Sequence, residues 1–252
     1  MSTHVAMEAA EPRYSGPHRW QIQPWARLVR RLKRPRAYTR WVDQYCTELN
    51  VTGRSAFDEV EGPCIVIANH QSHMDTLVLH EALPEHVRRH LYFGAAQDRW
   101  YVKGRRKLVL QPWDQSLVLG NFPIQRGGGS AALEHAHWLL SKGRHVFLFP
   151  EGTRATSDGL GRFRAGVALL ALEHGVPVVP AYLSGLKAMR PKGQKEVVPG
   201  PAGVEFLSPM RFKPGSDVAE VTRALWERLN QRHLAHQPSR ALERAPELER
   251  AA

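Results

Sequence analysis

Short apolar runs alternate with segments of helical periodicity through the middle of the chain. The first run, residues 64–68, is rich in β-branched residues and follows Gly62-Pro63, which is typical of a buried strand. Further strands are predicted at 91–96, 145–149, 178–183 and 203–207, with 117–121 as a strand leading into a tight path at 122–124. Helices are predicted at 76–83, 130–140 and 167–174, and after a cap at Ser216. This alternation predicts an α/β fold with a mostly parallel sheet flanked by helices.

The secondary structure of two segments is not decided by this pattern. Residues 45–51 fit either a strand or the end of a helix. Pro180 lies inside a predicted strand, and because proline cannot donate a hydrogen bond to a ladder, it favours an edge strand or a kink.

Basic residues are concentrated near the N-terminus. No Asp or Glu occurs between Arg13 and Arg40, so much of the formal net charge of +11 is local. Apolar residues recur there at helical spacing beside Arg and Lys: Trp25, Leu28, Val29 and Leu32. This composition predicts a basic amphipathic helix on an anionic membrane surface, with its apolar side in the headgroup layer. One alternative is a helix packed on its own domain with a solvated basic face; a nucleic-acid-binding arm is disfavoured because no nucleic-acid motif accompanies it.

Length and composition predict one core with extensions at both ends. The chain has 252 residues, 42% of them hydrophobic. We expect a disordered lead-in at 1–16, the basic helical segment at 17–49, the α/β domain at 50–236 and a polar tail at 237–252. Two cysteines are too few for a disulfide framework or a multi-cysteine metal site, which indicates a reducing compartment.

Neither a membrane span nor a signal peptide is predicted. No apolar run reaches the roughly 18 residues that a spanning helix needs, and the N-terminus lacks an apolar signal core. With the basic segment, this predicts a peripheral protein on the cytoplasmic face of the cell membrane.

Candidate chemistry follows the first predicted strand, in Asn69 to Asp75. In a regular helix His70 and Asp75 would point about 140° apart. If His70 instead lies on the strand exit and Asp75 in the first helical turn, the carboxylate can accept a hydrogen bond from one imidazole nitrogen. The other nitrogen could then take a proton as a general base. The alternative is a capping Asp beside a surface His.

Two later segments offer groups suited to a phosphorylated ligand. Arg126 precedes Gly127-Gly-Gly129, where bare backbone lets a phosphate approach, although such a loop can also be a plain flexible turn. In the loop at 149–154, Glu151 can accept from a hydroxyl, Gly152 offers an open backbone N–H and Arg154 can pair with phosphate. The alternative for this loop is a salt bridge between Glu151 and Arg154.

Four blocks in fixed order carry a resemblance to a known family: 70–75, 120–126, 149–154 and 176–180. Between about Asn50 and Leu207 the chain resembles the glycerolipid acyltransferases, which include the lysophosphatidic acid acyltransferases. His70 to Asp75 is similar to the family's His-x4-Asp, and Phe149 to Arg154 matches its Phe-Pro-Glu-Gly-Thr-Arg at every position.

The resemblance also implies substrate-binding residues. Glu151, Gly152, Thr153 and Arg154 would hold the acceptor's glycerol phosphate with Arg126, and residues 176–180 would line the acyl or acceptor site. The chain departs from common members at Pro123 and Gln125, where a Phe-Ile-x-Arg pattern with an acidic or amide residue is frequent. It also has Ala155 in place of a frequent Ser.

The implied reaction moves a fatty acyl group from a thioester to the free hydroxyl of a lyso-glycerophospholipid, converting 1-acyl-glycerol-3-phosphate to phosphatidic acid. His70 would be the base, and Asp75 would orient it. The chain has no Gly-x-Ser-x-Gly motif, so direct transfer is expected. Either acyl-CoA or acyl carrier protein would be the donor, and no cofactor or metal is expected.

Three alternatives stay open. The acceptor could be another lyso-lipid, such as a lyso-ornithine lipid, which needs less phosphate binding. A metal hydrolase could use His70, His73 and Asp75 as ligands. A non-catalytic protein that binds membranes or nucleic acid would need none of these side chains for chemistry.

Overall fold

The computed structural model describes residues 16–101, 114–127, 129–155, 159–190 and 193–236. Except for residue 16, the predicted lead-in at 1–16 lies outside these ranges, as does the predicted tail at 237–252. No helix in the described ranges combines the length and the apolar character needed to cross a membrane.

Seven strands form one sheet in the order β1-β7-β6-β2-β5-β3-β4 within the described ranges. Their bounds are β1 Cys46–Thr52, β2 Ile65–Ala68, β3 Leu91–Ala96, β4 Asn121–Ile124, β5 His145–Leu148, β6 Val178–Ser184 and β7 Gly200–Phe206. Neighbouring strands are parallel except β6 and β7, which are antiparallel. The predicted α/β fold with a mostly parallel sheet is confirmed.

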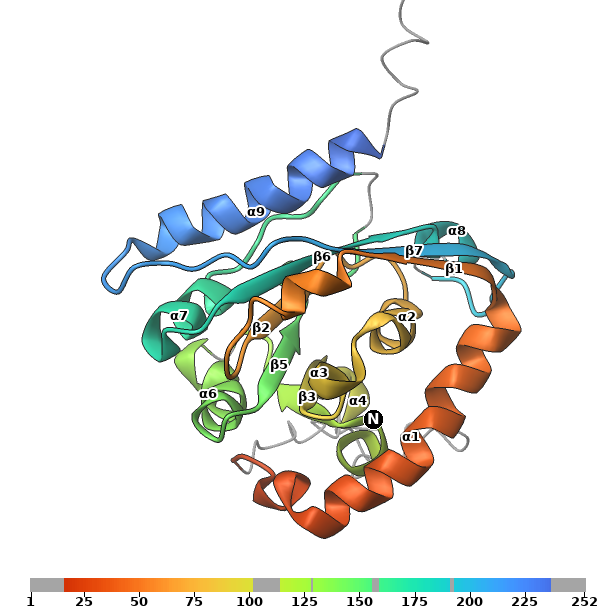
Figure 1. The fold of residues 1–252 in the computed structure, drawn as a ribbon, viewed down its shortest axis with the longest axis horizontal. Coiled ribbons are helices and arrows are strands. Elements are labelled where there is room, and N and C mark those ends of the chain that lie inside the picture. Colours follow the sequence, from red (N-terminus) through yellow and green to blue (C-terminus); the bar gives the residue numbers. More distant parts are fainter. Residues whose placement is uncertain (1–15, 102–113, 128, 156–158, 191–192, 237–252) are drawn as a thin grey trace, which may run out of the picture.

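Helices cover both faces of the sheet (Figure 1). Helices α6, α7 and α9 lie on one face, and α1, α2 and α8 on the other. Their bounds, with the short helices, are α1 Pro24–Tyr45, α2 Asp75–Ala82, α3 Glu85–Arg88, α4 Gln97–Trp100, α6 Glu134–Ser141, α7 Gly166–His174, α8 Leu186–Met189 and α9 Val218–Ala235. Four tighter or wider helical turns complete the described elements: η1 Arg19–Ile22, η2 Arg54–Phe57, η3 Gln115–Leu119 and η4 Gly129–Leu133.

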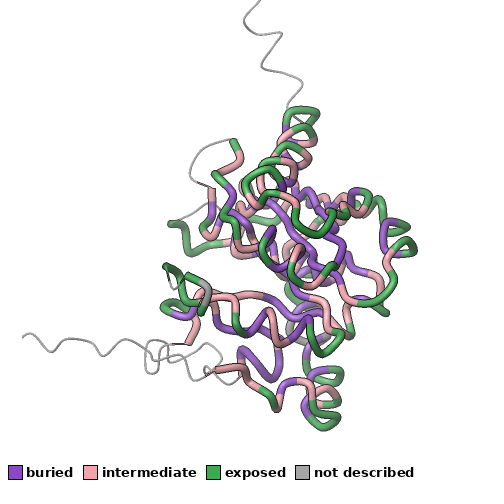
Figure 2. Tube along the Cα trace, turned by 90° about the vertical axis from the view of Figure 1, so that its left-hand side faces the viewer, coloured by how far each residue is buried: buried purple, intermediate pink, exposed green. Residues whose placement is uncertain are grey.

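Alternate residues of the central strands point into two separate cores. In β2, Val66 and Ala68 face the core under α2, whereas Ile65 and Ile67 face the core under α6, α7 and α9. Figure 2 shows buried segments gathered inside the molecule and exposed positions toward its outside. Because both faces are covered, the central strands read as continuous apolar runs.

The second sequence block folds differently from the prediction. Residues 115–119 form the wide helical turn η3 instead of a strand, and 122–124 belong to β4 instead of a turn after a strand. Gly120, with φ of 72°, ends η3 in the left-handed region. Pro123 fits within β4 because β4 is the edge strand of the sheet, where a missing N–H is tolerated.

Several other boundaries differ from the sequence-based expectation. Pro180 lies in β6, an internal strand, so the edge-strand interpretation is wrong; its carbonyl accepts a hydrogen bond from the Leu207 amide at 2.8 Å. Helix α6 begins at Glu134 after a short η4 turn, and Asp217, not Ser216, caps α9 by accepting from the Glu220 amide. The open segment 45–51 is mainly β1, which crosses the predicted boundary between residues 49 and 50.

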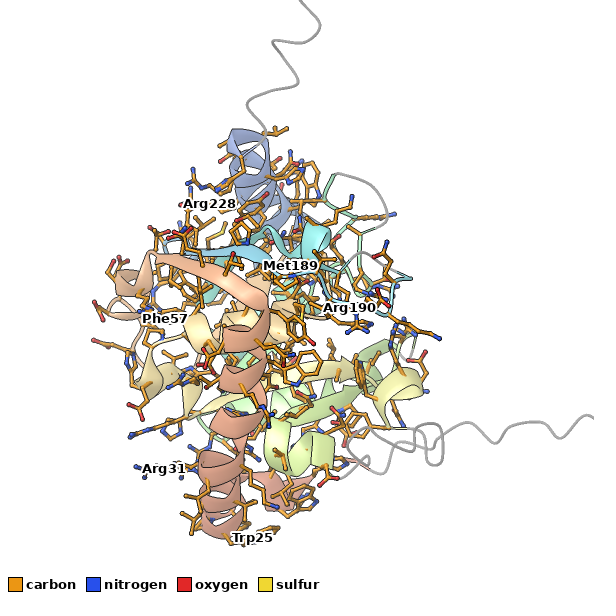
Figure 3. All side chains as sticks on the ribbon, turned by 90° about the vertical axis from the view of Figure 1, so that its right-hand side faces the viewer. Trp25, Arg31, Phe57, Met189, Arg190 and Arg228 are labelled. Carbon is orange, nitrogen blue, oxygen red and sulfur yellow. The ribbon has the colours of Figure 1, made fainter. Side chains whose placement is uncertain are left out.

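Helix α1 packs on its own domain, against α2 and η3, but not through the apolar residues on which the packed-helix alternative relied. Its buried stripe recurs every four residues and includes two arginines: Ala26, Arg30, Arg34, Tyr38 and Val42. The apolar residues Trp25, Leu28 and Leu32 are 54%, 57% and 62% exposed. Figure 3 shows Trp25 and Arg31 at the periphery of the molecule. A helix packed through its apolar side is therefore excluded, and so is a surface position for Arg30 and Arg34.

The two buried arginines bind backbone carbonyls. Arg30 donates to the carbonyls of Gln21, Ser116 and Leu117 at 3.1 to 3.2 Å and to the Tyr92 hydroxyl at 3.0 Å. Arg34 donates to the Leu119 carbonyl at 2.7 Å. Burial, together with the charge of Arg30, lowers the pKa of Arg34 to about 9, so this side chain is still charged at neutral pH. The hydrogen bonds of Arg30 and Arg34 together hold α1 against η3.

We predict that Arg30→Ala lowers the free energy of unfolding by about 3 kcal/mol, because it leaves several buried carbonyls without donors. Arg31→Ala, one position away on the exposed surface, should change it by less than about 0.5 kcal/mol. Urea unfolding of both variants measures the difference. Equal losses in the two variants would contradict a stabilising role for Arg30.

Candidate active site

The Asp75 carboxylate organises the loop between β2 and α2. Asp75 is the first residue of α2 and is fully buried. Its Oδ2 accepts hydrogen bonds from the backbone amides of Gln71, at 2.6 Å, and Ser72, at 2.9 Å. The same oxygen lies 2.8 Å from Nδ1 of His70. The helix N-terminus and these donors together stabilise the buried negative charge.

The imidazole of His70 is held in one orientation. Its ring stacks on Phe149, with 3.7 Å between centroids and an interplanar angle of 15°. The hydrogen bond to Asp75 assigns the proton to Nδ1, which makes Nε2 the nitrogen with a free lone pair. The His70 side chain is 18% exposed and lines a cavity. This arrangement can remove a proton from a bound hydroxyl.

Glu151 supports the backbone of His70. Its Oε1 accepts from the His70 amide and its Oε2 from the Gly161 amide, both at 2.8 Å. The Ala155 amide in turn donates to the His70 carbonyl at 2.8 Å. Burial raises the pKa of Glu151, while the two amide hydrogen bonds oppose that shift. Glu151 thus positions His70 from the neighbouring strand exit, and the predicted contact with a substrate hydroxyl stays a prediction.

Asn69 has a positioning role that the sequence reasoning missed. Its side chain pairs with the backbone of Leu183 in β6, accepting from the amide at 2.7 Å and donating to the carbonyl at 2.9 Å. The pair extends the β2–β6 ladder one residue beyond Ala68. The only signal in the sequence was a buried strand that ends directly in an Asn.

A cavity of about 1110 Å³ opens beside His70. Its cationic side chains come from α4 and from several loops: Arg99, Arg126, Arg154, Arg164, Arg190 and Lys195. The described lining includes no Asp or Glu. Its apolar side chains include Met74, Leu77, Phe93, Leu119, Ile124, Leu133, Leu148, Phe149, Val167 and Leu169. Such a cavity suits a ligand with an anionic head and a long apolar chain.

The predicted substrate-binding residues lie around this cavity. The cavity is lined by His70 and by four of the predicted residues: Arg126, Gly152, Thr153 and Arg154. Asp75 and Glu151 do not line it and contact His70 from the side away from the cavity. Burial lowers the pKa of Arg154, which is 8% exposed. Thr153 is exposed.

The neighbours of Gly152 and Arg126 limit how these residues can act. Gly152 has φ of 69°, and a Cβ there would lie 2.7 Å from Nε of Arg164. A glycine is therefore required for Arg164 to pack over the loop. Arg126 forms a two-point ion pair with Asp98, from Nε to Oδ1 at 3.1 Å and from Nη2 to Oδ2. Both partners are exposed, so water and salt weaken the pair.

His73 does not join His70 and Asp75 in a metal-binding arrangement. Its Nε2 lies 2.7 Å from Nη2 of Arg99, and its ring meets Trp100 edge-on. Burial, followed by the charges of nearby arginines, lowers the pKa of His73 to about 3, so the ring is neutral. In the described part of the chain, one group of three potential ligands converges, and it lies elsewhere, on α6 and α7. This geometry opposes the metal-hydrolase alternative.

Comparison with known proteins identifies the family. The Acyltransferase family model matches residues 48–184, which is more than half of the chain and includes the whole His70 loop and the Phe149 to Arg154 loop.

Relatives show the same relationship. The chain is 29% identical over 152 residues to the chloroplastic 1-acyl-sn-glycerol-3-phosphate acyltransferase BAT2 of Brassica napus, covering 59% of this chain and 41% of the relative. It is 28% identical over 171 residues to the 1-acyl-sn-glycerol-3-phosphate acyltransferase alpha of Ovis aries, covering 66% and 55%. The chain thus spans about half the length of these curated relatives.

A solved structure shares the fold. The crystal structure of the 1-acyl-sn-glycerophosphate acyltransferase PlsC from Thermotoga maritima superposes with a TM-score of 0.64 at 23% identity, covering 84% of this chain and 80% of that chain. Fold and family model agree, and the predicted resemblance is confirmed. The chain belongs to the Acyltransferase family.

Proposed function

We propose that this protein transfers a fatty acyl group from a thioester to the free hydroxyl of 1-acyl-glycerol-3-phosphate, giving phosphatidic acid for phospholipid biosynthesis. The observation that carries the proposal is the 2.8 Å contact between His70 Nδ1 and Asp75 Oδ2 at the edge of a cavity with cationic and apolar walls. The relatives named above bear the same activity in their names, which supports this choice of substrate.

In the proposed reaction His70 acts as general base. Its Nε2 takes the proton of the acceptor hydroxyl while the oxygen attacks the thioester carbonyl carbon. The resulting imidazolium is stabilised by Asp75, which keeps its own negative charge. The tetrahedral intermediate collapses with cleavage of the carbon–sulfur bond, and the thiolate receives the proton from His70. The products are the new ester and a free thiol.

The cavity favours a phosphate headgroup on the acceptor. Arginine forks bind phosphate oxygens through charge-assisted hydrogen bonds. Arg154 lies in the loop directly next to His70, and Arg126 lies on the loop after β4. Acyl-CoA and acyl carrier protein both present a thioester, and either fits this proposal as the donor.

We further propose that α1 holds the protein on the cytoplasmic face of an anionic membrane. Trp25, Leu28 and Leu32 present an exposed apolar strip, and Arg31 and Lys33 are exposed beside it. An apolar strip bordered by cations is typical of helices that lie in the headgroup layer.

We predict that His70→Ala and Asp75→Asn each lower kcat at least 1000-fold, because the first removes the base and the second its orienting anion. Purified variants are assayed with 1-acyl-glycerol-3-phosphate and a thioester donor, and circular dichroism verifies their folding. His86→Ala, at an exposed position on α3, is the matched control. A folded, active His70→Ala enzyme would refute the proposed mechanism.

Assays with a panel of lyso-lipids test the choice of acceptor. The wild type should prefer the phosphate monoester over zwitterionic and lyso-ornithine acceptors with either donor. Equal or better transfer to a lyso-ornithine lipid would replace the proposed acceptor while leaving the base assignment intact.

Substitutions of Arg126 and of Asp98 are predicted to change the KM for the acceptor in opposite directions. Arg126→Ala should raise the KM for the acceptor roughly tenfold with little change in kcat, since a charged hydrogen bond to phosphate is lost at a partly exposed site. Asp98→Asn should lower this KM a few-fold, because Asp98 competes with the phosphate for the same guanidinium. Steady-state kinetics measure both. An unchanged KM in Arg126→Ala would remove Arg126 from the acceptor site.

Membrane binding is tested by vesicle flotation with anionic lipids. The double variant Leu28→Ser/Leu32→Ser should bind less, because burial of two leucines contributes about 3 to 4 kcal/mol to partitioning. Leu234→Ser, which changes an exposed leucine on α9, is the control and should bind like the wild type. Equal flotation of all three proteins would exclude α1 as the membrane contact.

A further inference from the structure

Three potential metal ligands converge where the C-terminal end of α7 lies beside the middle of α6. They are His137 of α6 and the consecutive residues Glu173 and His174 at the end of α7, and their ligand atoms all lie within 4.8 Å of one another. His137 and His174 are partly buried, and Glu173 is exposed. Figure 1 shows α6 and α7 side by side in the layer that covers one face of the sheet.

One nitrogen of His137 lies at the centre of this group. Its Nδ1 is 3.0 Å from Nε2 of His174 and 3.1 Å from Oε1 of Glu173. If His174 donates a proton to Nδ1, the single lone pair of Nδ1 is used, and Nδ1 has no proton to donate to the Glu173 carboxylate 3.1 Å away. If Nδ1 carries the proton, the single proton must serve both neighbours. Hydrogen bonding between neutral rings therefore satisfies the three groups poorly.

A cation would satisfy all three groups at once. In a tetrahedral zinc site with bonds of about 2.0 to 2.1 Å, adjacent ligand atoms lie about 3.3 Å apart. The two observed distances from His137 Nδ1, 3.0 and 3.1 Å, fall within about 0.3 Å of that spacing. The ligand atoms of His174 and Glu173 lie within 4.8 Å of each other, so side-chain rotations would have to bring this third pair to the same spacing. Two imidazoles and one carboxylate are ligands that suit Zn²⁺, and a water molecule would complete the coordination.

The geometry points to a binding site for Zn²⁺ formed by His137, Glu173 and His174, separate from the His70 cavity. None of the three residues lines that cavity. The ion would link α6 to the C-terminal end of α7, whose first residues, Gly166 and Val167, do line it. The site is independent of the proposed acyl transfer and would cross-link the two helices.

The test uses the full-length protein without a polyhistidine tag. Co²⁺, which takes the same ligands and has visible d–d absorption, is titrated into the wild type and then displaced by Zn²⁺. We expect saturation at one equivalent with low-symmetry visible bands, and Zn²⁺ should raise the melting temperature as ligand binding requires. Isothermal titration with Zn²⁺ alone gives the affinity.

Variants separate this site from the other histidines of the chain. His137→Ala and His174→Ala should each weaken Zn²⁺ binding by more than roughly tenfold and abolish the Co²⁺ bands, since ligand loss exceeds the usual effect of outer-shell changes. Glu173→Gln should weaken binding less. His86→Ala should bind like the wild type, and acyl transfer should persist in every variant. Absence of Zn²⁺ binding by the wild type, or equal binding by His174→Ala, would overturn the proposal.

Discussion

The buried carboxylate of Asp75 is the constraint on which the active-site loop depends. A fully buried anion is tolerated only when donors replace the water that it has lost. Here Oδ2 receives two backbone amides of its own loop and Nδ1 of His70. The groups that neutralise the charge are therefore also the groups that fix the loop. The requirement to solvate Asp75 determines both the path of residues 70–75 and the tautomer of the imidazole.

The same imidazole is supported from three adjacent strands. β6, β2 and β5 are neighbours in the sheet, and the ends of β2 and β5 meet beside the end of β6. Asn69, after β2, binds the backbone of β6, and Glu151, after β5, binds the amide of His70. Chemistry at the carboxyl ends of parallel strands is a general property of α/β sheets, because these ends converge at one edge.

Sequence patterns predicted the parts of the fold that repeat locally. The strands near 65, 91, 145 and 178 followed from β-branched runs, and the structure has them. Residue spacing alone left the contact between His70 and Asp75 open; the family resemblance favoured it, and the structure has it. The contact of Glu151 with the His70 amide spans 81 positions, so local patterning contains no signal for it. Its carboxylate was expected to face a substrate because its backbone partners could not be seen.

Helix α1 is an exception to the usual rule that charged residues face solvent, because two of its arginines are buried. Its spacing of apolar residues predicted correctly that a helix forms, but not which stripe is buried. Arg30 and Arg34 lie inside because the carbonyls at the end of η3, more than 80 positions away, need donors. The periodicity of apolar residues contains no information about an interface between arginines and backbone carbonyls. Similarly, the ion pair of Arg126 with Asp98 depends on the approach of the loop after β4 to helix α4, which a motif does not encode.

Arg30 and Arg34 also connect helix α1 rigidly to η3, which forms part of the cavity wall. They bind the carbonyls of η3, and Gln115 and Leu119 of that turn line the cavity. A tilt of α1 would be transmitted to this wall instead of being absorbed by a loose joint. This wall of the cavity therefore keeps a fixed orientation relative to any surface that the outer side of α1 touches. A molecule that passes from such a surface into the cavity would therefore always meet this wall in the same orientation.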